Sequence, residues 1–179
     1  IGNTISISSG TFHSCAVEAS GALHCWGLDS SGSVWGDGGQ VADAPTEGNF
    51  VKAASSSFHS CVLNDSGLVT CWGLDAHGEV GVSWLAYPGV YTDIAVGMYH
   101  SCAINISGGI ECWGIADESG LDWGQVSGAP ATGTYLSLGY SSQNGQCAVR
   151  DDGEVVCWGE GYTGVERVTT VKRGDEIGR

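Results

Sequence analysis

The 179-residue sequence predicts an all-β fold built from four repeated units, and three observations lead to it. The motif His-Ser-Cys recurs along the chain, each time with a Cys-Trp-Gly whose cysteine lies ten positions after the first one, although the fourth copy has Gly145 in place of the histidine. A segment of alternating apolar and polar residues precedes each copy, as expected of half-buried strands. The first cysteines, at 15, 61, 102 and 147, recur every 41–46 residues, the length of one propeller blade. We therefore expect a β-propeller-type fold with four blades.

Each motif is expected to form a β-hairpin. A glycine lies six residues after the first cysteine in every copy and follows Ser or Asp, which is typical of a three-residue loop ending at positive φ. With 19–21 as the first loop, Cys15 lies opposite Cys25. Opposed strand residues have Cα atoms about 4.5–5.5 Å apart, within the roughly 4.4–6.8 Å that disulfides usually span. The sequence thus predicts one disulfide per hairpin: Cys15–Cys25, Cys61–Cys71, Cys102–Cys112 and Cys147–Cys157.

A zinc site is the competing interpretation of the recurring His-Ser-Cys sequence, because histidine and cysteine are zinc ligands. Zinc sites use closely spaced cysteine pairs, whereas here the second cysteine lies across a hairpin, and the fourth unit has no histidine. We therefore expect no metal and no other cofactor. The histidines are expected to be structural, each with a ring nitrogen bonded to a nearby carbonyl.

The remaining strands follow from the alternation. One strand is expected ahead of each hairpin: Thr4–Ser8, Phe50–Ala54, Tyr91–Val96 and Tyr135–Leu138. Each hairpin adds two more, such as Ser14–Glu18 and Ala22–Trp26, and the connections are expected to hold short outer strands, for instance Gln40–Ala42. The tail 165–171 alternates again and forms either the last strand or a strand that closes the ring against the N-terminus. The blade boundaries are expected at 1–48, 49–89, 90–133 and 134–179.

Composition and charge exclude several classes of function. Six Lys and Arg against twenty Asp and Glu give a net charge of −14, so the chain lacks the cationic surface that binds nucleic acid or anionic membranes. No segment approaches the roughly 18 apolar residues of a membrane helix, so no membrane insertion is expected. Paired cysteines indicate an oxidising compartment, and we expect a secreted, extracellular or cell-surface protein with no signal peptide visible at Ile1.

Two sequons mark candidate glycosylation sites at the expected hairpin tips, in hosts that attach such glycans. They are Asn64-Asp65-Ser66 and Asn105-Ile106-Ser107.

Tryptophans fall into two groups. Those that follow a cysteine are expected to pack between blades, because large buried aromatics dominate core energetics: Trp26, Trp72, Trp113 and Trp158. The second group lies in the variable, Gly-rich connections after Trp-Gly. Long loops on a rigid scaffold tend to carry function, and aromatic residues are enriched at binding hot spots. The binding candidates are therefore Trp35, Trp84, Tyr87, Trp123 and Tyr162.

No catalytic group is expected. The cysteines are assigned to disulfides, and Ser14, Ser60 and Ser101 each follow a histidine directly, so strand alternation points the two side chains to opposite faces. Neither a phosphate-binding loop nor a metalloprotease motif is present. The acidic loop residues lack the spacing of a calcium loop and indicate a solvated surface. We therefore expect a protein that is not an enzyme.

The repeated pattern His-Ser-Cys-Ala-Val-x-x-x-Gly-x-x-x-Cys-Trp-Gly, with a Gly-containing loop and a new strand after it, resembles the repeat of the regulator of chromosome condensation family. It looks most like the secreted bacterial members in which a cysteine pair staples the blade, and the β-lactamase inhibitor protein of this architecture is a relative. The resemblance covers essentially the whole chain and departs from the pattern at 141–145. It implies a β-propeller whose loops bind another protein.

Propellers of this family usually have seven blades, whereas this chain holds four units. A closed four-bladed ring, part of a longer chain, and an open arc completed by other copies are the three arrangements that follow. The leading hypothesis is an extracellular, non-catalytic binding or adhesion module for another protein or a cell-surface component. The alternatives are a structural subunit that self-associates edge to edge into a ring or filament, and a secreted inhibitor of a hydrolase.

Overall fold

The computed structural model describes residues 2–29, 38–81, 89–139, 141, 143–161 and 166–168, and the regular structure in them is β-strand. Four antiparallel sheets follow one another along the chain. Blade 1 contains β1 (Thr4–Ser9), β2 (His13–Glu18) and β3 (Leu23–Gly27), and blade 2 contains β4 (Phe50–Ser55), β5 (His59–Asn64) and β6 (Val69–Gly73). Blade 3 contains β7 (Tyr91–Val96), β8 (His100–Asn105) and β9 (Ile110–Gly114), and blade 4 contains β10 (Tyr135–Leu138), β11 (Gly145–Arg150), β12 (Val155–Gly159) and β13 (Glu166–Val168).

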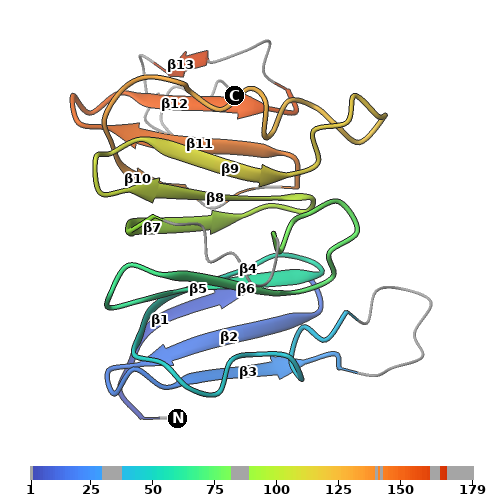
Figure 1. The fold of residues 1–179 in the computed structure, drawn as a ribbon, viewed down its shortest axis with the longest axis vertical. Coiled ribbons are helices and arrows are strands. Elements are labelled where there is room, and N and C mark those ends of the chain that lie inside the picture. Colours follow the sequence, from blue (N-terminus) through green and yellow to red (C-terminus); the bar gives the residue numbers. More distant parts are fainter. Residues whose placement is uncertain are drawn as a thin grey trace, which may run out of the picture.

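The blades stack in chain order, with blade 1 and blade 4 at opposite ends of the stack (Figure 1). Each blade packs on the next one along the chain, so the described residues form an open arc and not a closed ring. The strands expected from alternation are confirmed to within one residue at each end. An outer fourth strand occurs in blade 4, where β13 pairs with β12; within the described residues the tail strand therefore extends its own blade.

The expected outer strand at Gln40–Ala42 is wrong. These residues form a turn in which the amide of Asp43 donates to the carbonyl of Gly39 (3.0 Å). Gly39 adopts a φ of 77°, which turns the chain back on itself before a strand can begin. The alternation of three residues was too short a signal to distinguish a strand from a turn.

The hairpins form as expected. In the first, the amide of Gly21 donates to the carbonyl of Glu18 (2.9 Å), and Cys15 lies opposite Cys25. The four loop glycines have φ values of 80–86°. All eight cysteines form disulfides within their own hairpins, with Cα atoms 4.0–4.1 Å apart. The predicted pairing is confirmed in every blade.

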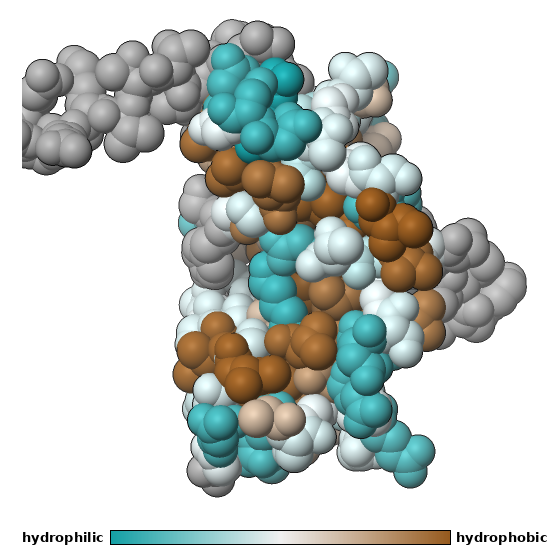
Figure 2. Space-filling view, turned by 90° about the vertical axis from the view of Figure 1, so that its left-hand side faces the viewer, coloured by the Kyte–Doolittle hydropathy of each residue, from teal (hydrophilic) through white to brown (hydrophobic). Residues whose placement is uncertain are grey.

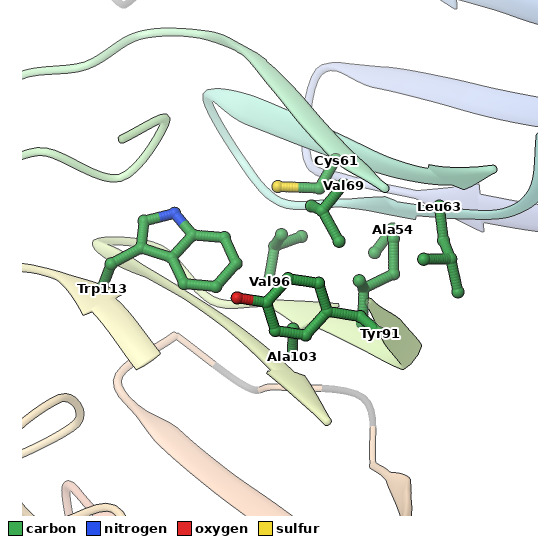
Figure 3. Close-up of a cluster of buried hydrophobic side chains, with 9 residues drawn as sticks. Ala54, Cys61, Leu63, Val69, Tyr91, Val96, Ala103 and Trp113 are labelled. Carbon is green, nitrogen blue, oxygen red and sulfur yellow. The ribbon is translucent and has the colours of Figure 1, made fainter. Parts of the chain in front are cut away.

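The core lies between the blades. One cluster joins Leu63 and Val69 of blade 2 to Tyr91, Ile94 and Trp113 of blade 3, and all five side chains are buried (Figure 3). Equivalent clusters join blades 1 and 2 and blades 3 and 4. A single blade is therefore too thin to bury both of its faces, and each one depends on its neighbours for a core.

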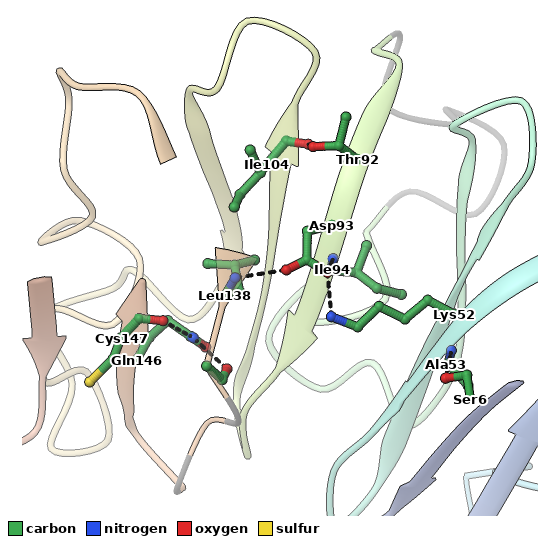
Figure 4. A network of polar contacts seen from close by, with 11 residues as sticks. Ser6, Lys52, Ala53, Thr92, Asp93, Ile94, Ile104, Leu138, Gln146 and Cys147 are labelled. Carbon is green, nitrogen blue, oxygen red and sulfur yellow. Dashed lines mark hydrogen bonds and ion pairs between the residues drawn. The ribbon is translucent and has the colours of Figure 1, made fainter. Parts of the chain in front are cut away.

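The first strands of the blades come together around a cavity of about 170 Å³, with lining residues from β1, β4, β7 and β10. Their edge amides bond to side chains of the neighbouring blade. Asp93 of β7 forms an ion pair with Lys52 of blade 2, and its second oxygen accepts from the amide of Leu138 of blade 4 (2.7 Å; Figure 4). Similarly, the amide of Ser55 donates to Ser8 Oγ (2.8 Å). Asp93 thus connects three consecutive blades.

Replacing Asp93 by alanine is expected to lower the free energy of unfolding by about 2–4 kcal/mol, because it leaves the ammonium of Lys52 and the buried amide of Leu138 without their acceptor. Urea unfolding followed by circular dichroism measures the loss. Lys52→Met is the matched control and should cost less, since Asp93 keeps both amide donors and Lys52 is partly exposed. Equal losses in the two variants would contradict a bridging role for Asp93.

Candidate binding surface

The two ends of the strands form two different rims. The hairpin tips lie at one end, on the left in Figure 1, and the long connections between blades begin at the other. At that second end, the amides of Leu28, Leu74 and Ile115 donate to the carbonyls of Phe12, Phe58 and Tyr99 (2.8, 2.9 and 3.0 Å). We call this end the connection rim; it comprises the turns 10–12, 56–58 and 97–99 and the described parts of the connections 28–48, 74–89 and 115–133.

A cavity of about 440 Å³ opens between the turns of the connection rim. The rings of Phe12 and Phe58 lie 5.7 Å apart, centroid to centroid, and Met98 lines the same cavity. The hydroxyls of Thr11 and Ser57 bond to each other across adjacent blades (2.8 Å). Apolar rings with a few hydroxyls in a concave site are typical of surfaces that receive a ligand or a partner side chain.

These turn residues were missed in the sequence, although a signal was present. An aromatic residue stands directly before the histidine in the first three units, as Phe12, Phe58 and Tyr99. Because the units superimpose in the stack, an aromatic at a fixed position produces a row along one rim. The third member, Tyr99, packs edge to face on His77 from the preceding connection, with ring centroids 5.5 Å apart.

Of the aromatic residues singled out in the connections, Trp123 lies in the described part of the chain. Its side chain is 51% exposed, while its amide donates to Gln125 Oε1 (2.6 Å). The turn is therefore held in place and the indole ring is presented to solvent. The other four candidates lie outside the described residues: Trp35, Trp84, Tyr87 and Tyr162.

A triplet Gly-Gln/Glu-Val fixes each connection to the next blade. The indole Nε1 of Trp72 donates to the carbonyl of Gln40 (2.9 Å), Trp113 donates to Glu79 (2.8 Å), and Trp158 donates to Gln125 (3.0 Å). The three acceptor residues are buried and follow glycines with φ values of 76–84°. This triplet lies at irregular distances from the cysteines in the sequence, so the regular spacing of the cysteine motif did not reveal it.

Histidines and serines also pair between blades. Nε2 of His13 lies 2.6 Å from Ser60 Oγ, and Nε2 of His59 lies 2.9 Å from Ser101 Oγ. The partner of these two nitrogens is thus a hydroxyl of the following blade, and the ring of His59 also has a backbone hydrogen bond with His100, in line with the expected carbonyl partner. Neighbours in sequence do face opposite sides, and for that reason a histidine meets the serine of the next unit.

Burial keeps these histidines neutral. It lowers the pKa of His59 to about 3 and that of His100 to about 4. His59 and Ser101 are both fully buried, so this Ser–His pair has no access to a substrate. The arrangement joins blades and does not build a catalytic centre.

The opposite rim carries the two sequons. Asn64 Oδ1 accepts from the amides of Ser66 and Leu68 (3.0 and 2.8 Å), and Asn105 caps its own turn in the same way. Figure 2 views this side and shows hydrophobic groups separated by hydrophilic ones. Leu68 and Ile106 are exposed here. Glycosylation of Asn64 and Asn105 stays a prediction.

Within the described ranges, no group of three or more His, Cys, Asp or Glu side chains could hold a metal ion. The same residues contain no helix of the length and apolar character needed to cross a membrane.

A family model matches the repeat in two of the four blades. The model of the "Regulator of chromosome condensation (RCC1) repeat" matches residues 5–33 and 50–79, in blades 1 and 2. No curated protein sequence matches the chain. The fold is similar to the CRINKLY WD40 ectodomain of the receptor kinase ACR4 from Arabidopsis thaliana, with a TM-score of 0.68 and 21% identity over 89% of this chain and 52% of that one.

Two further solved structures share the fold. Human WBSCR16 has a TM-score of 0.71 and 15% identity over 95% of this chain and 54% of that one. Prp20p from Saccharomyces cerevisiae, whose structure was described with its binding to Gsp1p and histones, has a TM-score of 0.62 and 17% identity over 83% and 41%. The chain thus spans about half, or less, of the length of these neighbours, and the likeness shows the architecture alone.

Proposed function

We propose that the chain, of which residues 5–33 and 50–79 match the regulator of chromosome condensation repeat, is a non-catalytic protein-binding module that acts outside the cell. Its binding surface is the connection rim. The observation that carries the proposal is the 440 Å³ cavity at this rim, in which Phe12 and Phe58 of consecutive blades lie side by side on a disulfide-stapled scaffold.

Rigidity supports this assignment. The disulfides and the indole bonds between blades hold the turns in place before a partner arrives, so little conformational entropy is lost on binding. The exposed ring of Trp123 adds a large apolar contact at low entropic cost. In the sequence, Trp35, Trp84 and Tyr87 belong to these connections and Tyr162 follows the Trp-Gly of blade 4. All four are proposed as further contacts.

The proposed location rests on the cysteines. Four disulfides in a chain of this size are stable in oxidising compartments, and reduced conditions would open them. A secreted or cell-surface protein meets other proteins and surface components there, which agrees with an adhesion function. The net charge of −14 favours partners with a basic surface.

The test compares the two rims. Biotinylated protein is cross-linked to surface and secreted proteins of its source, and the partner found is titrated against Phe12→Ser/Phe58→Ser. We expect affinity to fall by about 30-fold or more, because the loss of even one aromatic hot spot costs about 2 kcal/mol. The matched control is Leu68→Ser/Ile106→Ser at the hairpin tips, which should bind as the unchanged protein does. If the rim variant keeps its affinity and the tip variant loses it, the connection rim is not the binding surface.

A second candidate is inhibition of a secreted hydrolase. The acidic surface favours it, since charge complementarity would speed the encounter with a basic enzyme. The same rim would then enter the active-site cleft of the hydrolase. Assay of a panel of secreted hydrolases with and without the protein separates inhibition from simple binding, and Trp123→Ala should weaken any inhibition found.

A further inference from the structure

The cavity at the connection rim is neutral, although the protein is strongly acidic. Its described lining consists of two phenylalanine rings, a methionine, four hydroxyl side chains, a glutamine and a glycine, and none of these carries a charge. The chain as a whole has a net charge of −14. A charged ligand group would lose its hydration in this cavity without finding a counter-charge. The lining therefore favours a neutral occupant that has both apolar surface and hydrogen-bonding groups.

Blades 1 and 2 supply the aromatic part of the lining. The rings of Phe12 and Phe58 are tilted by 35° to each other, so they lie side by side and not edge to face. Beside them, the bond between the hydroxyls of Thr11 and Ser57 uses one of the two hydroxyl hydrogens, and the pair keeps one donor and several lone pairs for a ligand. Aromatic faces are negative and attract C–H groups, which carry a partial positive charge. A sugar ring finds both kinds of contact here.

Blades 3 and 4 add an amide to the lining. The amide of Met98 donates to the carbonyl of Gln143 (2.7 Å), which fixes the two turns to each other. Gln143 has a φ of 52°, an uncommon conformation for a residue other than glycine, and such strained residues cluster at binding sites. Its side chain is exposed and makes no hydrogen bond within the part of the chain that the structure describes. It can therefore offer two donors and an acceptor to a ligand.

A buried acceptor borders the cavity. Ser141 Oγ donates to the carbonyl of Gly145 (2.8 Å), so towards Nε2 of His100 (3.4 Å) the same hydroxyl can only accept. The proton of the neutral imidazole is therefore on Nε2, and Nδ1 is an acceptor. Burial lowers the pKa of His100 to about 4, so this acceptor persists at neutral pH. Nδ1 is buried and has no partner among the described residues.

In blade 2 a serine supplies the donor that is missing here. The hydroxyl of Ser56 lies 3.0 Å from Nδ1 of His59. Blade 3 has Gly97 in place of this serine, and Gly97 belongs to the lining of the cavity. A Cβ atom at Gly97 would lie 2.5 Å from Nδ1 of His100, so the acceptor lies directly behind this part of the lining. A buried acceptor without a donor destabilises the protein, and a ligand hydroxyl would satisfy it as Ser56 does in blade 2.

From these contacts we infer that the cavity binds a neutral sugar, the terminal residue of a glycan carried by the partner protein. Glycans are attached to secreted and cell-surface proteins, the class in which the partner is proposed to lie. The sugar ring packs on Phe12 and Phe58, and its hydroxyls bond to the Thr11–Ser57 pair, to the amide of Gln143 and to the buried imidazole. An apolar side chain would fill the same space but leave these polar groups unpaired. The inference rests on the proposed function, since it names the part of the partner that enters the rim.

Free sugars test the cavity without a partner. Methyl glycosides of glucose, galactose, mannose and N-acetylglucosamine are titrated into the protein and followed by saturation-transfer difference NMR, with glucuronic acid and N-acetylneuraminic acid as charged counterparts. We expect a neutral glycoside to bind with a Kd of about 1 mM, the strength typical of a ligand with roughly a dozen non-hydrogen atoms. The charged sugars should bind about 10-fold more weakly, because the cavity offers them no counter-charge. Failure of every neutral glycoside to bind would overturn the inference.

Thr11→Val and Thr70→Val are the matched variants. Both replace an exposed threonine hydroxyl by a methyl group, but Thr11 lines the cavity, whereas Thr70 lies in β6 and is not part of it. Thr11→Val and Gln143→Ala should each weaken sugar binding about 5-fold, since each removes a hydrogen-bonding group. Thr70→Val should bind as the unchanged protein does. Equal binding by all three variants would place the sugar elsewhere and contradict the inference.

The partner itself separates this inference from the proposed function. Removal of its glycans with endoglycosidases should lower its affinity about 10-fold or more. If the deglycosylated partner binds as before while Phe12→Ser/Phe58→Ser still loses affinity, a side chain fills the cavity: the inference is then wrong and the proposed function stands. If neither change affects binding, the connection rim is not the binding surface, and the proposed function fails as well.

Discussion

Replacing Trp113 by alanine is expected to destabilise the protein by about 3–5 kcal/mol, the cost of truncating a large buried aromatic side chain. Trp113 is 5% exposed, packs in the cluster between blades 2 and 3, and donates its indole N–H to the carbonyl of Glu79 (2.8 Å). Its removal opens a cavity at the centre of the stack. Ser101 Oγ still donates to the same carbonyl, so most of the loss is lost packing. Guanidinium unfolding measures the change.

Trp26→Ala is the control that the repeat itself provides. The residue occupies the same position in its blade but is 42% exposed, so its removal should cost about 1 kcal/mol or less. Similar losses for Trp26→Ala and Trp113→Ala would contradict the open stack, because Trp26 would then be buried against another blade.

Acidification from pH 7 to pH 5 is expected to destabilise the protein by about 2 kcal/mol for each of His59 and His100. Burial lowers the pKa of these histidines to about 3 and about 4, while both take up protons near pH 6.5 in the unfolded chain. Below pH 6.5 the unfolded state therefore binds more protons than the folded state. Stability falls with pH until the folded pKa is reached, and it is fully retained above about pH 7.

His59→Gln isolates this contribution. The glutamine amide keeps a donor for Ser101 Oγ but does not titrate, so the variant should lose about 2 kcal/mol less between pH 7 and pH 5 than the unchanged protein. Chemical unfolding of both proteins at the two pH values gives the loss of stability of each. The many carboxylates contribute equally to both losses, so their effect cancels in the difference. Identical pH dependence in both proteins would show that His59 is not buried in its neutral form.

Local chemistry made the hairpins predictable from sequence. The loop glycine and the ten-residue spacing place Cys15 opposite Cys25 without any knowledge of the rest of the chain. Strand boundaries followed from alternation, since each first strand buries one side against its neighbour. Because the motif recurs with the same spacing, the same argument predicted all four hairpins.

Contacts between blades were not predictable in the same way, because they join residues about one repeat apart. The pairing of His59 with Ser101 and of Trp113 with Glu79 depends on how two blades dock, which no local pattern encodes. The aromatic row of Phe12 and Phe58 becomes visible only when the units are superimposed. Trp26 does not pack between blades as expected and is 42% exposed, because within the described residues no blade lies on that side of blade 1.

The most direct test of the open stack is the oxidation rate of each tryptophan in the unmodified protein, measured by hydroxyl-radical footprinting under non-reducing conditions. The structure predicts rapid reaction at Trp26 and Trp123, which are 42% and 51% exposed, and slow reaction at Trp72, Trp113 and Trp158, which are at most 5% exposed. Protection of Trp26 to the level of Trp113 would contradict the open stack, because in a closed ring another blade would cover Trp26.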